Sequence, residues 1–208
     1  MVGEWLAEYT APRILEIGCG TGSLTAELLA LDADIRLIGC DVSRQAISIA
    51  HRQLGEGTSA AFEVGDAAEL GFKDSSVDAV VGNSVLHHIP YEDALREIFR
   101  VLKPGGSFWF SEPNMFNPQI AIEKNIHILG KILQNSEEET AFFRWPLAGC
   151  LGNIGYCNIT IKPYDFLHPI TPAGLVPMMD RVGRLLERVP LLREFAGSLW
   201  IRGRKVGA

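Results

Sequence analysis

The sequence predicts an α/β protein built around a doubly wound sheet, and three observations favour this fold class. Short apolar runs rich in Val, Ile and Phe alternate along the chain with segments of helical spacing. A glycine-rich turn, GCGTG at residues 18–22, directly follows the first apolar run. The chain has 208 residues and is 47% hydrophobic. This suits a single domain over residues 1–208 whose core needs neither disulfides nor metals.

Seven strands are predicted, and the first five are short apolar runs that each close on a turn or a polar residue. A sixth strand is expected at about 157–166 and a seventh at 198–205 (SLWIRGRK). The first five are expected to be parallel because helical segments separate them, and ligands of such sheets bind at the carboxyl ends of the strands. These five runs are residues 13–17, 35–41, 61–66, 77–83 and 107–113.

The segments between these runs carry apolar residues at helical spacing. The first is expected at about 24–31, and the second follows a candidate N-cap at Ser43. The third, at about 95–102, is expected to stop at the KPGG that follows it. Two more helices are expected between 115 and 156, and a helical insertion at about 167–196 precedes the seventh strand.

Charge and cysteine usage exclude several classes of protein. The net charge is -6, but residues 162–208 hold eight Lys or Arg against four Asp or Glu, which leaves +4 there and -10 on the rest. Nucleic-acid binding is not expected of an acidic body without a basic stripe. The four cysteines form no CxxC pair, so we expect neither a metal site nor a disulfide framework.

The N-terminal residues and the hydropathy of the chain give an expectation about its compartment. MVGEWLAEYT has no basic region ahead of an apolar stretch. No window reaches the roughly 18 uncharged apolar residues that a membrane span needs. A soluble, cytoplasmic protein is therefore expected.

The turn after the first strand indicates a ligand site, because glycine lets a ligand lie against the backbone. A dinucleotide-binding GxGxxG would need a third glycine at position 23, which is Ser23, and the chain has no GxxxxGK run for a P-loop. Glu16, two residues before the first glycine, would repel a pyrophosphate. The acid instead favours a cationic ligand that carries an amino group.

Five motifs carry a family resemblance, and they occur in order at ordinary loop lengths. The chain resembles the class I S-adenosylmethionine-dependent methyltransferases of the small-molecule type, closely so over residues 13 to about 114. The motifs are ILEIGCGTGSLT (14–25), IGCDVS (38–43), VGDAAEL (64–70), VDAVVGNSVLHHI (77–89) and LREIFRVLKPGGSFWFSEPN (95–114).

The resemblance implies a Rossmann-like sheet whose seventh strand is antiparallel. It also implies S-adenosyl-L-methionine as cofactor, S-adenosyl-L-homocysteine as product, and methyl transfer to oxygen, nitrogen or carbon. The acceptor is expected to be a small molecule, a sugar or a lipid intermediate. Residues 1–114 would form the cofactor-binding half and residues 115–208 the acceptor side.

The resemblance also implies roles for the residues that follow the first two strands. Glu16 would hold the methionine amino group of the cofactor, directly or through water. Gly18, Cys19 and Gly20 would offer backbone to its methionine and ribose portion, and Gly22 would ease close packing at the helix start. Asp41 would accept the ribose hydroxyls and Val42 would pack on the adenine ring.

Further along, Asp66 would accept the adenine amino hydrogen, while Ala67 would present a backbone N–H to the ring. Asp also favours helix caps, so a cap at Asp66 is the structural alternative. Asn83 ends the fourth strand on the cofactor side.

Two residues are candidates for a general base. His88 could deprotonate the acceptor because histidine titrates near neutrality, but it could instead line the cofactor pocket, and the neighbouring His87 is expected to be structural. Glu112 closes the fifth strand and could serve as a base if desolvation raises its pKa, or it could simply mark the strand end. Methyl transfer does not require a base, because holding the acceptor in line already lowers the barrier.

The insertion carries a basic amphipathic helix. Its apolar face comprises Leu175, Met178, Met179, Val182, Leu185, Leu186 and Val189, while Arg181, Arg184 and Arg188 lie elsewhere on the helix. Residues 175–196 could bind a membrane surface, roof the acceptor pocket, or pack against their own domain or a second copy.

One departure from the family concerns the N-terminus. Relatives usually have some tens of residues before the first strand that form a lid, whereas Met1 to Pro12 precede it here. The lid is therefore expected to be absent or truncated. Two other functions stay open: a non-catalytic module that binds the cofactor, and a nicotinamide-dependent oxidoreductase, which Ser23 opposes.

Overall fold

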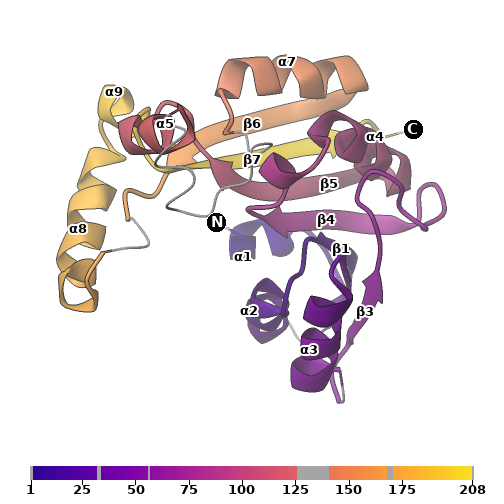
Figure 1. Ribbon diagram of the computed structural model, residues 1–208. Coiled ribbons are helices and arrows are strands. Elements are labelled where there is room, and N and C mark those ends of the chain that lie inside the picture. The colour runs from indigo at the N-terminus through magenta and orange to yellow at the C-terminus, as the bar shows by residue number, and fades with distance from the viewer. Residues whose placement is uncertain (1, 32–33, 56, 126–140, 168–170, 208) are drawn as a thin grey trace.

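A seven-stranded sheet forms the centre of the computed structural model, which describes residues 2–31, 34–55, 57–125, 141–167 and 171–207 (Figure 1). The strand order is β3-β2-β1-β4-β5-β7-β6. The strands are β1 (Arg13–Ile17), β2 (Arg36–Asp41), β3 (Ala60–Val64), β4 (Val77–Asn83), β5 (Leu102–Pro113), β6 (Tyr156–Tyr164) and β7 (Ser198–Lys205). Strands β1 to β5 pair in parallel, and β7 is antiparallel to both of its neighbours, which confirms the predicted fold class.

Helices cover both faces of this sheet (Figure 1). On one face lie α1 (Val2–Leu6), α2 (Ser23–Leu31) and α3 (Arg44–Leu54). On the other lie α4 (Tyr91–Val101) and α7 (Arg144–Ile154). The remaining helices follow the carboxyl ends of β4, β5 and β6: η1 (Leu86–His88), α5 (Pro118–Asn125), η2 (Ala173–Leu175), α8 (Val176–Leu186) and α9 (Pro190–Arg193).

The start of β5 differs from the sequence-based expectation. The helix before it ends at Val101, and the KPGG segment, expected to be a turn, belongs to the strand. Gly105 has φ +79°, and a Cβ on Gly106 would lie 2.7 Å from the carbonyl oxygen of Asp78. These two glycines let the strand start early and pass close to β4, where the pairing shifts register after Val77.

Polar contacts to the sheet hold α1 in place. The Nε1 of Trp5 donates to the Oγ of Ser107 at 2.7 Å, and the hydroxyl of Tyr9 lies 2.6 Å from the same oxygen. Trp5 is fully buried, so the short N-terminal helix is packed into the core beneath β5. Of the helices in the described ranges, none is both long and apolar enough to cross a membrane.

Candidate functional site

The glycine-rich turn after β1 has three glycines with positive φ: Gly18 (+66°), Gly20 (+54°) and Gly22 (+91°). A Cβ on Gly18 would lie 2.5 Å from Cγ2 of Val85, and one on Gly22 would lie 2.8 Å from Cδ1 of Leu54. These two positions therefore need glycine for packing as well as for backbone conformation. A Cβ on Gly20 would meet nothing within 4 Å, so the turn borders open space at that residue.

The carboxylate of Asp41, at the end of β2, is held by two backbone donors. The N–H of Gly20 donates to Oδ2 at 2.9 Å, and the N–H of Ser43 donates to Oδ1 at 2.8 Å. Ser43 itself caps α3, because its Oγ accepts from the N–H of Ala46 at 3.2 Å. A carboxylate offers about four acceptor positions, so Asp41 keeps the capacity to accept two ligand hydroxyls while its orientation is fixed.

Glu16 lies under α2, one strand away from Asp41. It is 1% exposed, and its Oε2 accepts from the Oγ1 of Thr25 at 2.5 Å. Burial raises the pKa of Glu16 to about 7; the hydrogen bond from Thr25 opposes this rise, and the negative charge of Asp41 adds to it. A cationic group beside Glu16 would favour its ionised form.

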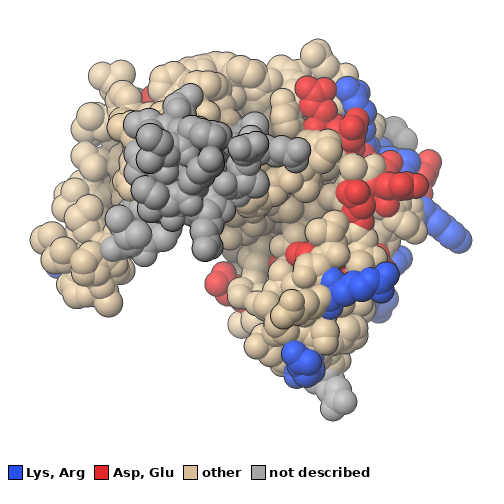
Figure 2. Space-filling view, viewed as in Figure 1, with Lys and Arg blue, Asp and Glu red and all other residues tan. Residues whose placement is uncertain are grey.

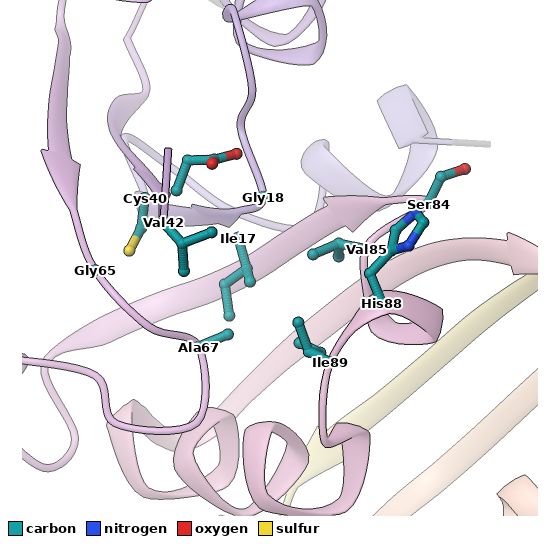
Figure 3. A pocket seen from close by; sticks show the side chains of 11 residues that line it. Ile17, Gly18, Cys40, Val42, Gly65, Ala67, Ser84, Val85, His88 and Ile89 are labelled. Atoms are coloured by element: carbon teal, nitrogen blue, oxygen red, sulfur yellow. The ribbon is translucent and has the colours of Figure 1, made fainter. Parts of the chain in front are cut away.

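A cavity of about 270 Å³ lies beside the turn at the carboxyl ends of β1, β2 and β4 (Figure 3). Its wall is mostly apolar: Figure 3 shows Ile17 and Val42 on one side and Ala67 and Ile89 across from them. Val42 is 67% exposed although it is apolar, which suits a wall against which a flat ring can pack. The lining residues are Ile17, Gly18, Cys40, Asp41, Val42, Gly65, Ala67, Ser84, Val85, His88 and Ile89.

Seven residues predicted for the site are not part of this lining: Glu16, Cys19, Gly20, Gly22, Asp66, Asn83 and Glu112. One of them is Asp66. Its Oδ1 accepts from the N–H of Ala68 at 2.8 Å, and its carbonyl accepts from Glu69 at 3.1 Å. Asp66 therefore stabilises the turn after β3. It is not a helix cap, the alternative that its sequence context left open, because no helix lies between β3 and β4, where every residue is described. Asn83 is exposed at the end of β4.

Glu112 is the most heavily hydrogen-bonded acid of the region. It is 1% exposed; its Oε1 accepts from the N–H groups of Val85 at 2.9 Å and Leu86 at 2.8 Å. Its Oε2 lies 2.7 Å from Nδ1 of His87, which is the donor because a carboxylate only accepts. These three hydrogen bonds thus tie η1 and the residue before it to β5. One of the donors is the backbone N–H of Val85, a residue of the cavity wall.

The loop that Glu112 holds carries the cavity-lining histidine. His88 is exposed and lines the cavity (Figure 3). Its ring centroid lies 3.9 Å from that of His87. The preceding Ser84 has φ +53°, uncommon for a residue other than glycine. This backbone conformation turns the chain sharply after β4. Val85 and His88 then line the cavity, while Leu86 and His87 contact Glu112 of β5.

Cysteine thiols near the turn stay protonated. Burial is the main cause that raises the pKa of Cys40 to about 12 and that of Cys19 still higher. Cys19 packs against Ile47 and Phe62 rather than into the cavity. Among the described residues, no three His, Cys, Asp or Glu side chains come together as a metal-binding group.

Sequence reasoning missed part of the cavity wall and the contact beneath it. Ile17, Cys40 and Gly65 were not predicted, although each lies within the last two residues of a strand or directly after one, at the carboxyl edge, which is a usable signal. The bond between His87 and Glu112 joins residues 25 positions apart, and nothing in a single sequence indicates such a pairing.

Comparison with known proteins shows what the chain is similar to. Residues 14–106 match a family described as a methyltransferase domain. The O-methyltransferase cnsE of Penicillium expansum is 35% identical over 108 residues, which cover 50% of this chain and 39% of that protein. A demethylmenaquinone methyltransferase of Staphylococcus aureus is 28% identical over 172 residues, 73% of this chain and 70% of that protein.

A solved structure has the same fold along almost the whole chain. The S-adenosylmethionine-dependent methyltransferase of Thermotoga maritima matches with a TM-score of 0.70 at 21% identity, over 98% of this chain and 85% of that one. The chain spans less than half the length of the fungal O-methyltransferases that it matches, 39% and 48%. Residues 14–106 thus match a methyltransferase domain, and the seven-stranded sheet has the fold of a solved S-adenosylmethionine-dependent methyltransferase.

Proposed function

We propose that the chain binds S-adenosylmethionine in the cavity beside the glycine-rich turn and transfers its methyl group to a small-molecule, sugar or lipid-intermediate acceptor. The observation that carries the proposal is Asp41, whose carboxylate is fixed by Gly20 and Ser43 at the edge of an otherwise apolar cavity. A carboxylate so oriented suits a vicinal pair of ribose hydroxyls, and the apolar wall beside it suits an adenine ring.

The charges around the turn support the rest of the assignment. Glu16 has a pKa of about 7, so a ligand ammonium group nearby would be met by a carboxyl that ionises readily on binding. The open space at Gly20 leaves room for a ligand against the backbone. Val42 and Ala67 would contact the base from opposite sides of the cavity.

The bound cofactor supplies a methyl group already activated on a sulfonium. The residues of the chain then have to bind, orient and exclude water, which can provide most of the rate acceleration. His88 is the better candidate to accept a proton from the acceptor, because it lines the cavity and is exposed. Glu112 is buried with three donors on its two oxygens, so a positioning role suits it better.

Calorimetric titration with S-adenosylmethionine and S-adenosylhomocysteine tests the proposal. Asp41→Asn removes the charge and one acceptor without changing size, and hydrogen bonds to charged groups contribute about 1.5–3 kcal/mol. We expect both affinities to fall by at least about tenfold. Asp93→Asn, an exposed acid in the first turn of α4, is the matched control and should bind normally. Unchanged affinity of Asp41→Asn would overturn the proposed cofactor site.

A second measurement separates catalysis from mere binding. Incubation with methyl-labelled cofactor and an extract of metabolites and lipids should yield a labelled product, and mass spectrometry would identify the acceptor. Normal cofactor affinity without any labelled product would instead favour the non-catalytic binding module.

A further inference from the structure

Helix α8 and the short α9 after it expose large apolar side chains. Leu175, just before α8, begins a row that continues through Met178, Val182, Leu185 and Val189; we call these five residues the apolar face of α8. Met178, Val182 and Leu185 lie within α8, and their spacing of three and four residues puts them on one side of the helix. Leu175 and Val189 flank its two ends, and each of the five residues is between 42% and 60% exposed. In α9, Leu191 is 75% exposed. Contiguous exposed apolar residues of this kind mark an interaction site.

The helix is attached to its own domain through a different side. In α8, all of which is described, only Gly183 is buried, and a Cβ there would lie 3.4 Å from Cβ of Phe166. Just after the helix, Oε1 of Glu187 accepts from the N–H of Asp165 at 2.9 Å. Gly183 lies about 100° around the helix from Val182, so the apolar face is not the surface that packs against the domain.

The unpaired charges beside the apolar face are positive. The acids of this region all have partners: Asp180 pairs with Arg184, Glu187 holds the backbone of Asp165, and Glu194 pairs with Arg144 at 3.1 Å. Arg181 and Arg188 are exposed, and neither has an ion-pair partner in the described ranges of the chain. Arg181 lies one turn before Leu185 on α8, and Arg188 lies in the turn directly after the helix, where its N–H donates to the carbonyl of Leu185.

We propose that the apolar face of α8 docks on the surface of an anionic lipid bilayer. A helix that combines an apolar face with flanking arginines is the form that lies in a lipid interface, and each basic residue near an anionic leaflet adds to the attraction. A second copy of the chain fits less well. A two-fold contact uses the same patch on both copies, so it would bring the unpaired arginines of both copies to one interface.

The position of the helix gives this contact a functional direction. α8 and α9 connect the end of β6 to the start of β7, at the sheet edge where the carboxyl end of β5 also lies. Figure 1 shows α8 projecting beyond this edge, and Figure 2 shows its projecting end with few charged side chains on the side in view. Docking through the apolar face would bring the edge of the sheet that holds the cavity towards the bilayer.

Co-sedimentation of the full chain with sucrose-loaded vesicles tests the proposal. Vesicles of phosphatidylcholine alone are compared with vesicles that also contain phosphatidylserine, without any cofactor, so the result does not depend on the proposed methyltransferase activity. We expect binding to the anionic vesicles that weakens with added salt. The double variant Leu185→Ser, Leu191→Ser should bind at least about tenfold more weakly. The double variant Arg181→Gln, Arg188→Gln should lose on the order of thirtyfold.

Matched controls use the same substitutions elsewhere on the surface. Leu31→Ser changes a leucine of α2 that is 56% exposed, and Arg36→Gln changes an exposed arginine at the start of β2. Both controls should bind vesicles like the native chain, and all variants should keep the native melting temperature. Absence of vesicle binding by the native chain would overturn the proposal, as would undiminished binding by the leucine double variant. A dimer in sedimentation equilibrium that this variant abolishes, without vesicle binding, would assign the face to self-association instead.

Discussion

Glu112→Gln separates a positioning role for this acid from a proton-accepting one. The native carboxylate is 1% exposed and accepts from the backbone of Val85 and Leu86 and from the ring of His87. Glutamine keeps one acceptor for the two backbone donors, but it loses the charge and places an amide in the region of the His87 ring. Hydrogen bonds to a charged group contribute about 1.5–3 kcal/mol, roughly twice a neutral one. We therefore expect the free energy of unfolding to fall by about 2–4 kcal/mol.

The loss should be visible in ligand binding as well as in stability. Because one of the three bonds holds the backbone of Val85, which lines the cavity, Glu112→Gln should weaken S-adenosylhomocysteine binding. Urea unfolding followed by circular dichroism gives the stability change, and calorimetric titration gives the affinity. Glu63→Gln, an exposed acid on β3, is the matched control and should change neither. Native stability and affinity in Glu112→Gln, together with a large drop in turnover, would refute the positioning role and make Glu112 the base.

Two further predictions concern the glycine-rich turn. Gly18→Ala should destabilise the protein by at least about 1 kcal/mol more than Gly57→Ala, because both have positive φ but only the new Cβ at Gly18 meets a neighbour within 4 Å, the branched side chain of Val85; equal urea midpoints would contradict this. The pKa of Glu16 is raised from 4.5 to about 7 in the folded chain, so its contribution to stability is fully present below the unfolded pKa and is lost as pH rises through the folded one. Relative to Glu16→Gln, the free energy of unfolding should fall by about 3 kcal/mol across this window, and parallel pH profiles for the two proteins would disprove the shift.

Strand positions could be predicted from the sequence wherever burial is continuous. Residues 13–17 and 77–83 are strands in the structure with the predicted bounds, and nearly all of their residues are buried. Residues 198–205 also form a strand with the predicted bounds, although their burial alternates. The start of β5 was missed because KPGG has the composition of a turn, and only the close approach to β4 reveals why glycines are needed there. The strand propensity of KPGG depends on its local sequence, whereas the close approach of β5 to β4 depends on tertiary packing.

The candidate site was predictable where it follows strand ends. Asp41, Val42, Ala67 and His88 line or border the cavity as their positions after strands suggest. What could not be predicted are contacts between distant residues, such as the three donors on Glu112, and the direction of a helix face. The periodicity of α8 identifies its apolar stripe but does not say whether the stripe meets the core or the surroundings.

The place of β7 in the sheet has a consequence for biosynthesis. β7 is translated after the six other strands, yet it lies between β5 and β6 and hydrogen-bonds to both. Until β7 has emerged from the ribosome, β5 lacks one neighbour, and β6 has no strand partner within the described part of the chain. The nascent polypeptide therefore carries unpaired strand edges, which invite association with other chains. Any change that delays the arrival of β7 should lower the yield of native protein more than its effect on equilibrium stability would suggest.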